Sequence, residues 1–174
     1  AAGTAKLYAE ESTITTEISS TGTSIIKLHS SKVTPGKDHK PLIQANEDSL
    51  IILENVELDS SVDLLFTGNG AVAEAFISKP EFGGKSILIK GTARITSDQI
   101  NPKAFASFLL FATKVGDFHS LIINEGKQPI NKDVLGIWDI SNVSQGDYKI
   151  YLEVKDKSGE LIAKTMQRIT IQEI

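Results

Sequence analysis

The chain has 174 residues, 40% of them apolar and 23% charged, and it contains no cysteine. This composition is that of a folded protein rather than a disordered one, and it excludes disulfides, a thiolate nucleophile and a cysteine-based zinc site. Residues 1–86 hold 7 Lys against 12 Asp or Glu, and residues 87–174 hold 11 Lys or Arg against 10, for a net charge of −4. Neither half has the basic stripe that nucleic acid binding requires, and the apolar runs are too short for a membrane span.

The chain opens with Ala1-Ala2-Gly3, without Met. Small residues at this point suit the product of signal-peptide cleavage, although a trimmed chain would begin in the same way. We therefore expect a secreted or cell-surface protein.

The first half repeats a pattern of apolar residues followed by small polar ones, in the segments Thr4–Thr16, Thr23–Thr34, Leu42–Leu58 and Val62–Gly70. Similar triplets recur about every 20 residues, a spacing typical of the coils of a right-handed β-solenoid: Ser12-Thr13-Ile14, Ser31-Lys32-Val33 and Asn55-Val56-Glu57. Hairpins of similar length in a second sandwich or jelly roll would give the same spacing. The sequence predicts an N-terminal β module over residues 1–85, and both architectures remain open.

The second half contains the clearest strand. Apolar and mostly polar residues alternate over Asp147–Lys155, as in a half-buried strand. The strand stops at Asp156–Gly159, where Gly159 can take a positive φ, and Leu161–Ala163 follows as the other half of a β-hairpin. We expect Ile169–Ile171 to close the sheet.

Further short strands are bounded by Gly, Pro, Asn or Asp, at Ser86–Thr92, Phe105–Thr113, His119–Ile123 and Val134–Ile140. The stretch Phe105–Thr113 also fits a helical stripe, because Phe105, Phe108, Leu109 and Ala112 follow Pro102 at helical spacing. We predict a strand there, and an all-β module over residues 86–174.

The run Leu135–Ile140, continued by Val143–Val154 and Asp156–Gly159, resembles the end of immunoglobulin-like and fibronectin type III-like β-sandwich modules of extracellular and cell-surface proteins. The resemblance implies that residues 86–174 form an Ig-like sandwich. In such modules a Tyr after a Gly starts a late strand, and its hydroxyl bonds back to upstream backbone as a tyrosine corner. Tyr148 after Gly146 matches this role. The chain lacks the Cys pair of antibody domains, and the resemblance implies no particular ligand.

Residues that could carry chemistry are few. The histidines His29, His39 and His119 lie in no nucleophile-elbow motif, and we expect them to be surface or partly buried residues. The acidic stretch Glu54, Glu57, Asp59 and Asp63 offers candidates for a glycosidase pair or a calcium site, but the spacing of an EF-hand loop is missing and solvated charge is the favoured interpretation. The sequence contains no phosphate loop. We expect a protein without catalytic, cofactor or metal sites.

Two positions have a structural and a functional interpretation. Trp138 either lies in the core or, with Tyr151 or Tyr8, forms an aromatic platform for a sugar; its apolar neighbours favour the core. The sequon Asn142-Val143-Ser144 makes Asn142 a candidate glycosylation site on a turn.

These observations lead to a non-catalytic extracellular structural or interaction protein that self-associates or binds other surface proteins, such as the subunit of a filament or layer. The tract Thr4–Ile18 alternates loosely and could complete the sheet edge of a neighbour, or pair with its own sheet. The alternatives are a carbohydrate-binding module and an accessory domain of a polysaccharide-degrading enzyme.

Overall fold

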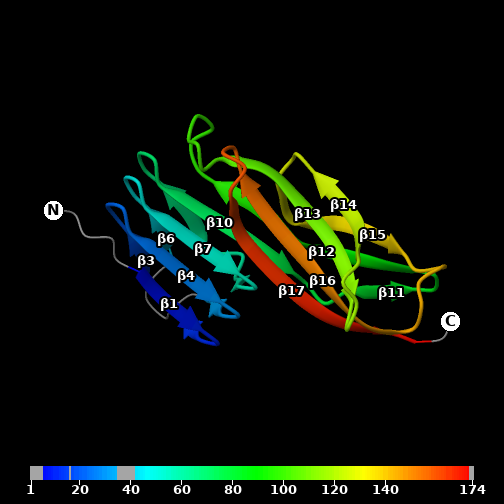
Figure 1. Ribbon diagram of the computed structural model, residues 1–174. Helices are drawn as coiled ribbons and strands as arrows, with labels where there is room; N and C mark the ends of the chain where they lie inside the picture. Colours follow the sequence, from blue (N-terminus) through cyan, green and yellow to red (C-terminus); the bar gives the residue numbers. More distant parts are fainter. Residues whose placement is uncertain (1–5, 16, 35–41, 173–174) are drawn as a thin grey trace.

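A computed structural model describes residues 6–15, 17–34 and 42–172. Every regular element in these ranges is a β-strand, which confirms the all-β fold class. The strands form one seven-stranded sheet, one four-stranded sheet and two three-stranded sheets (Figure 1).

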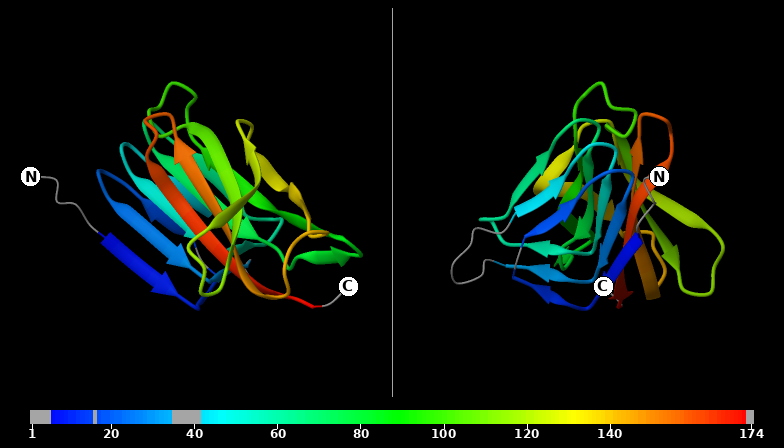
Figure 2. Two further views of the ribbon diagram at one scale, coloured as in Figure 1. Left: turned by 45° about the vertical axis from the view of Figure 1, so that its right-hand side comes forward. Right: turned by 90° about the vertical axis from the view of Figure 1, so that its left-hand side faces the viewer.

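The N-terminal half winds through three stacks of parallel strands. The first stack contains β1 (Lys6–Glu10), β4 (Ile25–His29), β7 (Leu50–Glu54) and β10 (Ala71–Ile77). The second contains β2 (Thr13–Ile14), β5 (Lys32–Val33) and β8 (Glu57–Leu58). The third contains β3 (Ile18–Ser20), β6 (Leu42–Ala45) and β9 (Asp63–Phe66). Each circuit through the three stacks is one coil of a β-solenoid, whereas a jelly roll would pair its strands antiparallel. Figure 2 shows the coils lying one behind another.

Turns with the same backbone geometry recur in successive coils. A positive φ occurs at Gly22, Glu47 and Gly68, each at the second position of the turn that leads back to the first stack. A second set follows the strands of the first stack, at Glu11, Ser30 and Asn55. Coils can stack only if their corners have the same shape, so the chain accepts left-handed backbone even at non-glycine positions. The side-chain amide of Asn55 donates a hydrogen bond of 3.2 Å to the Ser30 hydroxyl, which links two of these corners.

The seven-stranded sheet is a wall shared by two cores. On β7, Ile51 and Leu53 face the solenoid interior, while Leu50 and Ile52 face the C-terminal half. On β10, Val72 joins the solenoid core, and alternate residues join the other core, namely Ala71, Ala73, Ala75 and Ile77. The strand β10 is consequently buried on both faces.

The sheet continues into the C-terminal half with antiparallel pairing through β12 (Ser86–Thr96), β11 (Glu81–Gly83) and β15 (Ile130–Asp139). The boundary expected between residues 85 and 86 falls inside the β11–β12 hairpin. Against this sheet packs the four-stranded antiparallel sheet, in the order β14 (Ser120–Gly126), β13 (Phe105–Lys114), β16 (Gly146–Asp156) and β17 (Leu161–Ile171).

The residues Phe105–Lys114 form a strand and not a helix. Phe108, Leu110 and Ala112 alternate into the core between the two layers, a period of two that outweighs the helical spacing seen in sequence. The stretches Leu161–Ala163 and Ile169–Ile171 are the two ends of the single strand β17. Within the described ranges, the chain has no helix long and apolar enough to cross a membrane.

Candidate functional site

The C-terminal half is open along one side, between β14 and β15. In the described part of the chain β14 pairs only with β13, and β15 pairs only with β12, so the two strands are edges of opposite layers. At one end the side-chain amide of Asn124 bridges them, donating to the carbonyl oxygen of Leu135 at 2.6 Å. Beyond that bridge lies a groove of about 610 Å³ whose apolar lining comes from Leu121, Ile122, Ile123, Ile137, Trp138 and Val143.

The floor of the groove is closely packed. Trp138 is only 5% exposed and packs edge-to-face on Tyr148, with ring centroids 5.4 Å apart. The Tyr148 hydroxyl donates to the carbonyl oxygen of Ser144 at 2.8 Å, which is the bond of a tyrosine corner. Trp138 is therefore a core residue.

Gly146 shapes the start of β16 beneath the groove. Its φ of +134° lies in a region that side chains disfavour, and a Cβ there would lie 2.9 Å from Cε of Lys114. The Lys114 ammonium donates to the Ser144 hydroxyl at 2.9 Å and lies 5.9 Å from the Tyr148 ring centroid. The glycine thus lets Lys114 reach across to the corner.

Gly159 lies away from the groove, in the β16–β17 turn. Its φ is +84°, and its N–H donates to the Asp156 carbonyl at 3.0 Å. The buried Asp156 carboxylate accepts from the backbone N–H groups of Ser158 and Glu160 and from the Ser158 hydroxyl. Gly159 therefore has a role in the hairpin only.

The rim of the groove is polar. Asn142 is exposed on the turn after β15 and lines the groove, so a glycan there would overhang it. Hydrogen bonds from the His119 ring and backbone lower the pKa of Asp117, and those from Ser141 lower the pKa of Asp139. Both rim carboxylates are consequently ionised at neutral pH.

The strand β14 exposes apolar side chains on both faces. Leu121 and Ile122 are neighbours and so point to opposite faces, yet 47% and 68% of their surfaces are exposed. An isolated exposed Leu or Ile is ordinary, but a sheet edge with apolar residues on both faces is a pairing template. In the sequence, the run Leu121-Ile122-Ile123 predicts a strand but does not indicate that it is exposed.

Three other edge strands, β17, β8 and β15, have backbone groups that bond to side chains. The N–H of Lys164 in β17 donates to Glu54 at 3.0 Å, and the Leu58 carbonyl of β8 accepts from the Lys132 ammonium at 3.1 Å. The side-chain amide of Asn124 occupies the Leu135 carbonyl of β15 in the same way. These contacts occupy backbone groups that a partner strand would need.

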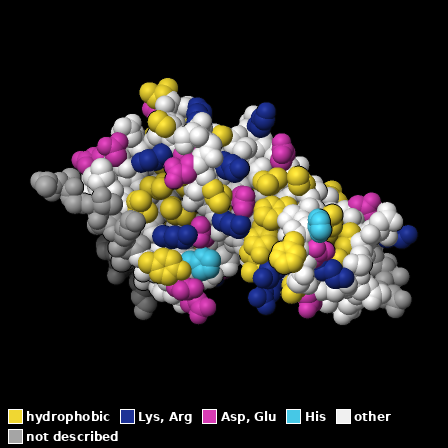
Figure 3. All heavy atoms as spheres, in the orientation of Figure 1, with side chains coloured by type: hydrophobic (Ala, Val, Ile, Leu, Met, Phe, Trp, Pro, Cys, Tyr) yellow, Lys and Arg dark blue, Asp and Glu magenta, His cyan; other side chains and the backbone are white. Residues whose placement is uncertain are grey.

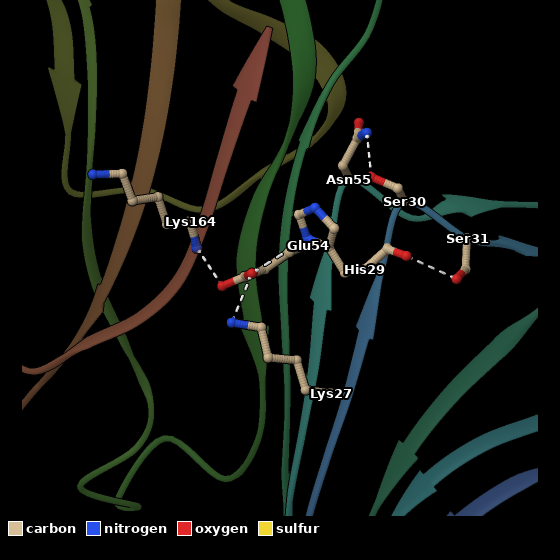
Figure 4. Close-up of polar contacts among 7 residues, drawn as sticks. All are labelled: Lys27, His29, Ser30, Ser31, Glu54, Asn55 and Lys164. Carbon is tan, nitrogen blue, oxygen red and sulfur yellow. Dashed lines mark hydrogen bonds and ion pairs between the residues drawn. The ribbon is translucent and has the colours of Figure 1, made fainter. Parts of the chain in front are cut away.

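Glu54 lies in a polar cluster on the shared wall (Figure 4). It is buried, and besides the Lys164 N–H it contacts the Lys27 ammonium at 2.8 Å and Nδ1 of His29 at 3.6 Å. The nearby Ser31 hydroxyl donates to the main-chain carbonyl of His29 rather than to the ring. This arrangement joins the solenoid to β17 and does not resemble a nucleophile with its base.

The remaining candidates are dispersed. His119 is exposed at the rim, and His39 lies outside the described residues. Glu57 pairs with Lys32 at 3.4 Å, and hydrogen bonds from the Ser61 backbone and hydroxyl lower the pKa of Asp59. Among the described residues no three His, Asp or Glu side chains gather as a metal site would require.

The aromatic platform considered for the alternative, carbohydrate-binding function is not assembled. Tyr8 lies on β1 and Tyr151 on β16, in different sheets, and Trp138 is buried. Tyr151 instead stacks on Phe111 with centroids 5.1 Å apart, and the Lys164 ammonium lies 4.8 Å from its ring centroid. In Figure 3, hydrophobic side chains gather over the four-stranded sheet and, separately, over the strands of the first stack, with charged residues between them.

Comparison of the chain with protein-family models, with curated proteins and with solved structures finds no match. The functional interpretation therefore depends on the geometry of the open edge.

Proposed function

We propose that the protein is a non-catalytic structural or interaction protein, secreted or held at the cell surface, that self-associates by adding a β-strand at the free edge of β14. The observation that carries this proposal is the edge itself, which exposes Leu121 on one face and Ile122 on the other.

Strand addition suits this edge physically. An edge strand has hydrogen-bonding partners on one side only, so half of its N–H and C=O groups face water. A partner strand would pair with these groups, and its alternating side chains would cover Leu121 and Ile122. The groove beside β14 offers space for the side chains on one face.

The Ig-like interpretation of the C-terminal half belongs to the same proposal. Its support is the Tyr148 corner, the buried Trp138 and the two packed antiparallel layers. Extracellular modules of this kind commonly serve in recognition and assembly, which supports a surface location by analogy only.

The proposal is tested with Ile122→Lys, which places a charge on the exposed edge without touching a core. The matched control is Ile100→Lys, because Ile100 is 89% exposed but lies in a loop between strands. We expect the wild type and Ile100→Lys to form oligomers as concentration rises in sedimentation analysis, and Ile122→Lys to remain monomeric. A wild type that stays monomeric at high concentration, or an Ile122→Lys variant that assembles as well as the control, would overturn the proposal.

The alternative of a carbohydrate-binding module draws its support from the stacked pair Phe111 and Tyr151, both half-buried on the outer face of the four-stranded sheet. Such a pair could stack on a sugar ring if the Lys164 side chain moved aside. Binding to a glycan array that is lost in Phe111→Ala but kept in Ile122→Lys would favour this function.

A further inference from the structure

We infer that the strand received by β14 is β1 of a second copy, so that the protein assembles head to tail. This inference rests on the proposed function and adds the identity of the partner strand.

The two edges lie at opposite ends of the molecule. In Figure 1 β1 lies beside β3 in the coil at one end of the molecule, and β14 lies toward the other end. Within the described ranges β1 pairs only with β4, and β14 only with β13. One copy therefore offers two separate edges, and using one leaves the other free.

The backbone of β1 is open to pairing. The N–H of Glu11 donates to the carbonyl of His29 in β4 at 3.2 Å. Backbone groups alternate along a strand, so the N–H groups of Tyr8 and Glu10 point away from β4 to the free side. The Tyr8 side chain is 57% exposed and belongs to neither hydrophobic core of the described residues.

The two edges are compatible in length. β1 has five residues and β14 has seven, so the shorter strand can pair along its full length. Adjacent side chains of β1 would fall on opposite faces of the joined sheet. That arrangement covers Leu121 and Ile122 together and brings the Tyr8 ring against an apolar edge.

Charge disfavours the symmetric alternative in which two β1 edges meet. Residues 1–86 carry a net charge of −5, against +1 for residues 87–174. Exposed carboxylates of the first coil include Glu10, Glu11 and Glu17. A β1–β1 contact would bring two sets of these carboxylates together, whereas a β1–β14 contact places one set beside a groove that holds the Lys114 ammonium as well as the carboxylates of Asp117 and Asp139.

Head-to-tail contacts have a defined consequence for assembly. A contact between unlike edges occupies only one of the two edges of each subunit. Further subunits can therefore add, and the assembly grows into an open filament or closes into a ring. Contacts between like edges would stop at a dimer.

The experiment uses two blocked variants of the full chain. Tyr8→Pro removes a free-side N–H from β1 and leaves the bonds to β4, since proline is accepted on the outer side of an edge strand. Its control is Tyr8→Thr, which keeps the N–H. Ile122→Lys blocks β14. We expect each blocked variant alone to remain monomeric in sedimentation analysis, and an equimolar mixture to form a 1:1 dimer that grows no further.

The mixture separates the two proposals. Assembly of Tyr8→Pro alone into dimers, with Ile122→Lys monomeric, would show that β14 pairs with β14 and would overturn the inference while leaving the proposed function intact. A mixture without dimers, although wild type and Tyr8→Thr assemble, would also overturn it. Monomeric wild type would overturn the proposed function itself. Circular dichroism of each variant establishes that the fold is retained.

Discussion

The carboxylate of Glu54 accepts a hydrogen bond from the backbone N–H of Lys164, 110 positions later in the chain, and so fixes the edge of β17 to the solenoid wall. The same carboxylate receives the Lys27 ammonium. One buried side chain thus satisfies donors from both halves of the protein.

Glu54→Ala leaves these donors without their acceptor. We expect the free energy of unfolding to fall by about 1 to 3 kcal/mol, because the part-buried Lys164 N–H loses its acceptor, while the loss of the more exposed Lys27 ion pair adds little. Urea denaturation measures the loss. Glu57→Ala is the control, because its ion pair with Lys32 is exposed and its removal should change stability by less than about 0.5 kcal/mol. Equal effects of the two variants would contradict the role of Glu54.

Tyr148→Phe removes only the hydroxyl that donates to Ser144 and keeps the ring against Trp138. The expected loss is about 1 kcal/mol, the usual net contribution of one hydrogen bond. Tyr151→Phe serves as the comparison, since its ring lies on the outer face and stacks on Phe111. A thermal or urea midpoint for Tyr148→Phe no lower than that for Tyr151→Phe would exclude a stabilising corner.

Gly146→Ala combines a disfavoured φ with a close approach to Lys114. We expect a destabilisation of about 1 to 3 kcal/mol. Adding Lys114→Ala should recover the steric part of this loss, because the Cβ then has room. Gly116→Ala isolates the backbone part, since Gly116 also has a positive φ but no atom within 4 Å of the new Cβ. Lack of any recovery in the double variant would contradict the steric contribution.

Glu74 should make stability depend on pH. Its burial raises its pKa, and the hydrogen bond and charge of Arg94 only partly oppose this shift. In the window between the ordinary and the raised pKa, the folded state holds a proton that the unfolded chain has lost. The resulting stabilisation is present below the ordinary pKa and is lost as pH rises through the raised value.

The measurement compares wild type with Glu74→Gln by urea unfolding between about pH 4 and pH 8. Glu74→Gln also loses the ion pair with Arg94, which changes the free energy of unfolding by a similar amount at every pH. A difference between the two proteins in how stability depends on pH therefore reports the ionisation of Glu74. We expect the wild type to gain stability relative to Glu74→Gln as pH falls. Parallel curves, or a gain in the opposite direction, would refute the raised pKa.

Alternation of side chains predicted much of the C-terminal half from sequence. The predicted strand Asp147–Lys155 lies within β16. It could be recognised because every second residue of a half-buried strand is apolar, so the alternation is visible in the sequence. The solenoid is harder to predict from sequence, because its coils share the geometry of their corners more than the identity of their residues. The triplets at Ser12 and Ser31 are equivalent in the stack, but the third should begin at Val56, one residue after the position that the spacing indicated.

The open edge could not be predicted in the same way. The run Leu121-Ile122-Ile123 reads as a buried strand, and only the three-dimensional pairing shows that no strand of the described chain covers it. Glu54 and Lys164 lie 110 positions apart, and no local sequence pattern indicates the hydrogen bond between them. Sequence periodicity reports the face a residue occupies, whereas these features depend on which strands become neighbours.

The stacked coils also set a length. Parallel strands in a stack lie about 4.8 Å apart, so each additional coil before β4 would move β1 away from β14 by one such step without altering the two packed layers of the C-terminal half. The solenoid then acts as a molecular ruler, in which the number of coils fixes the axial repeat of any assembly that joins the two edges.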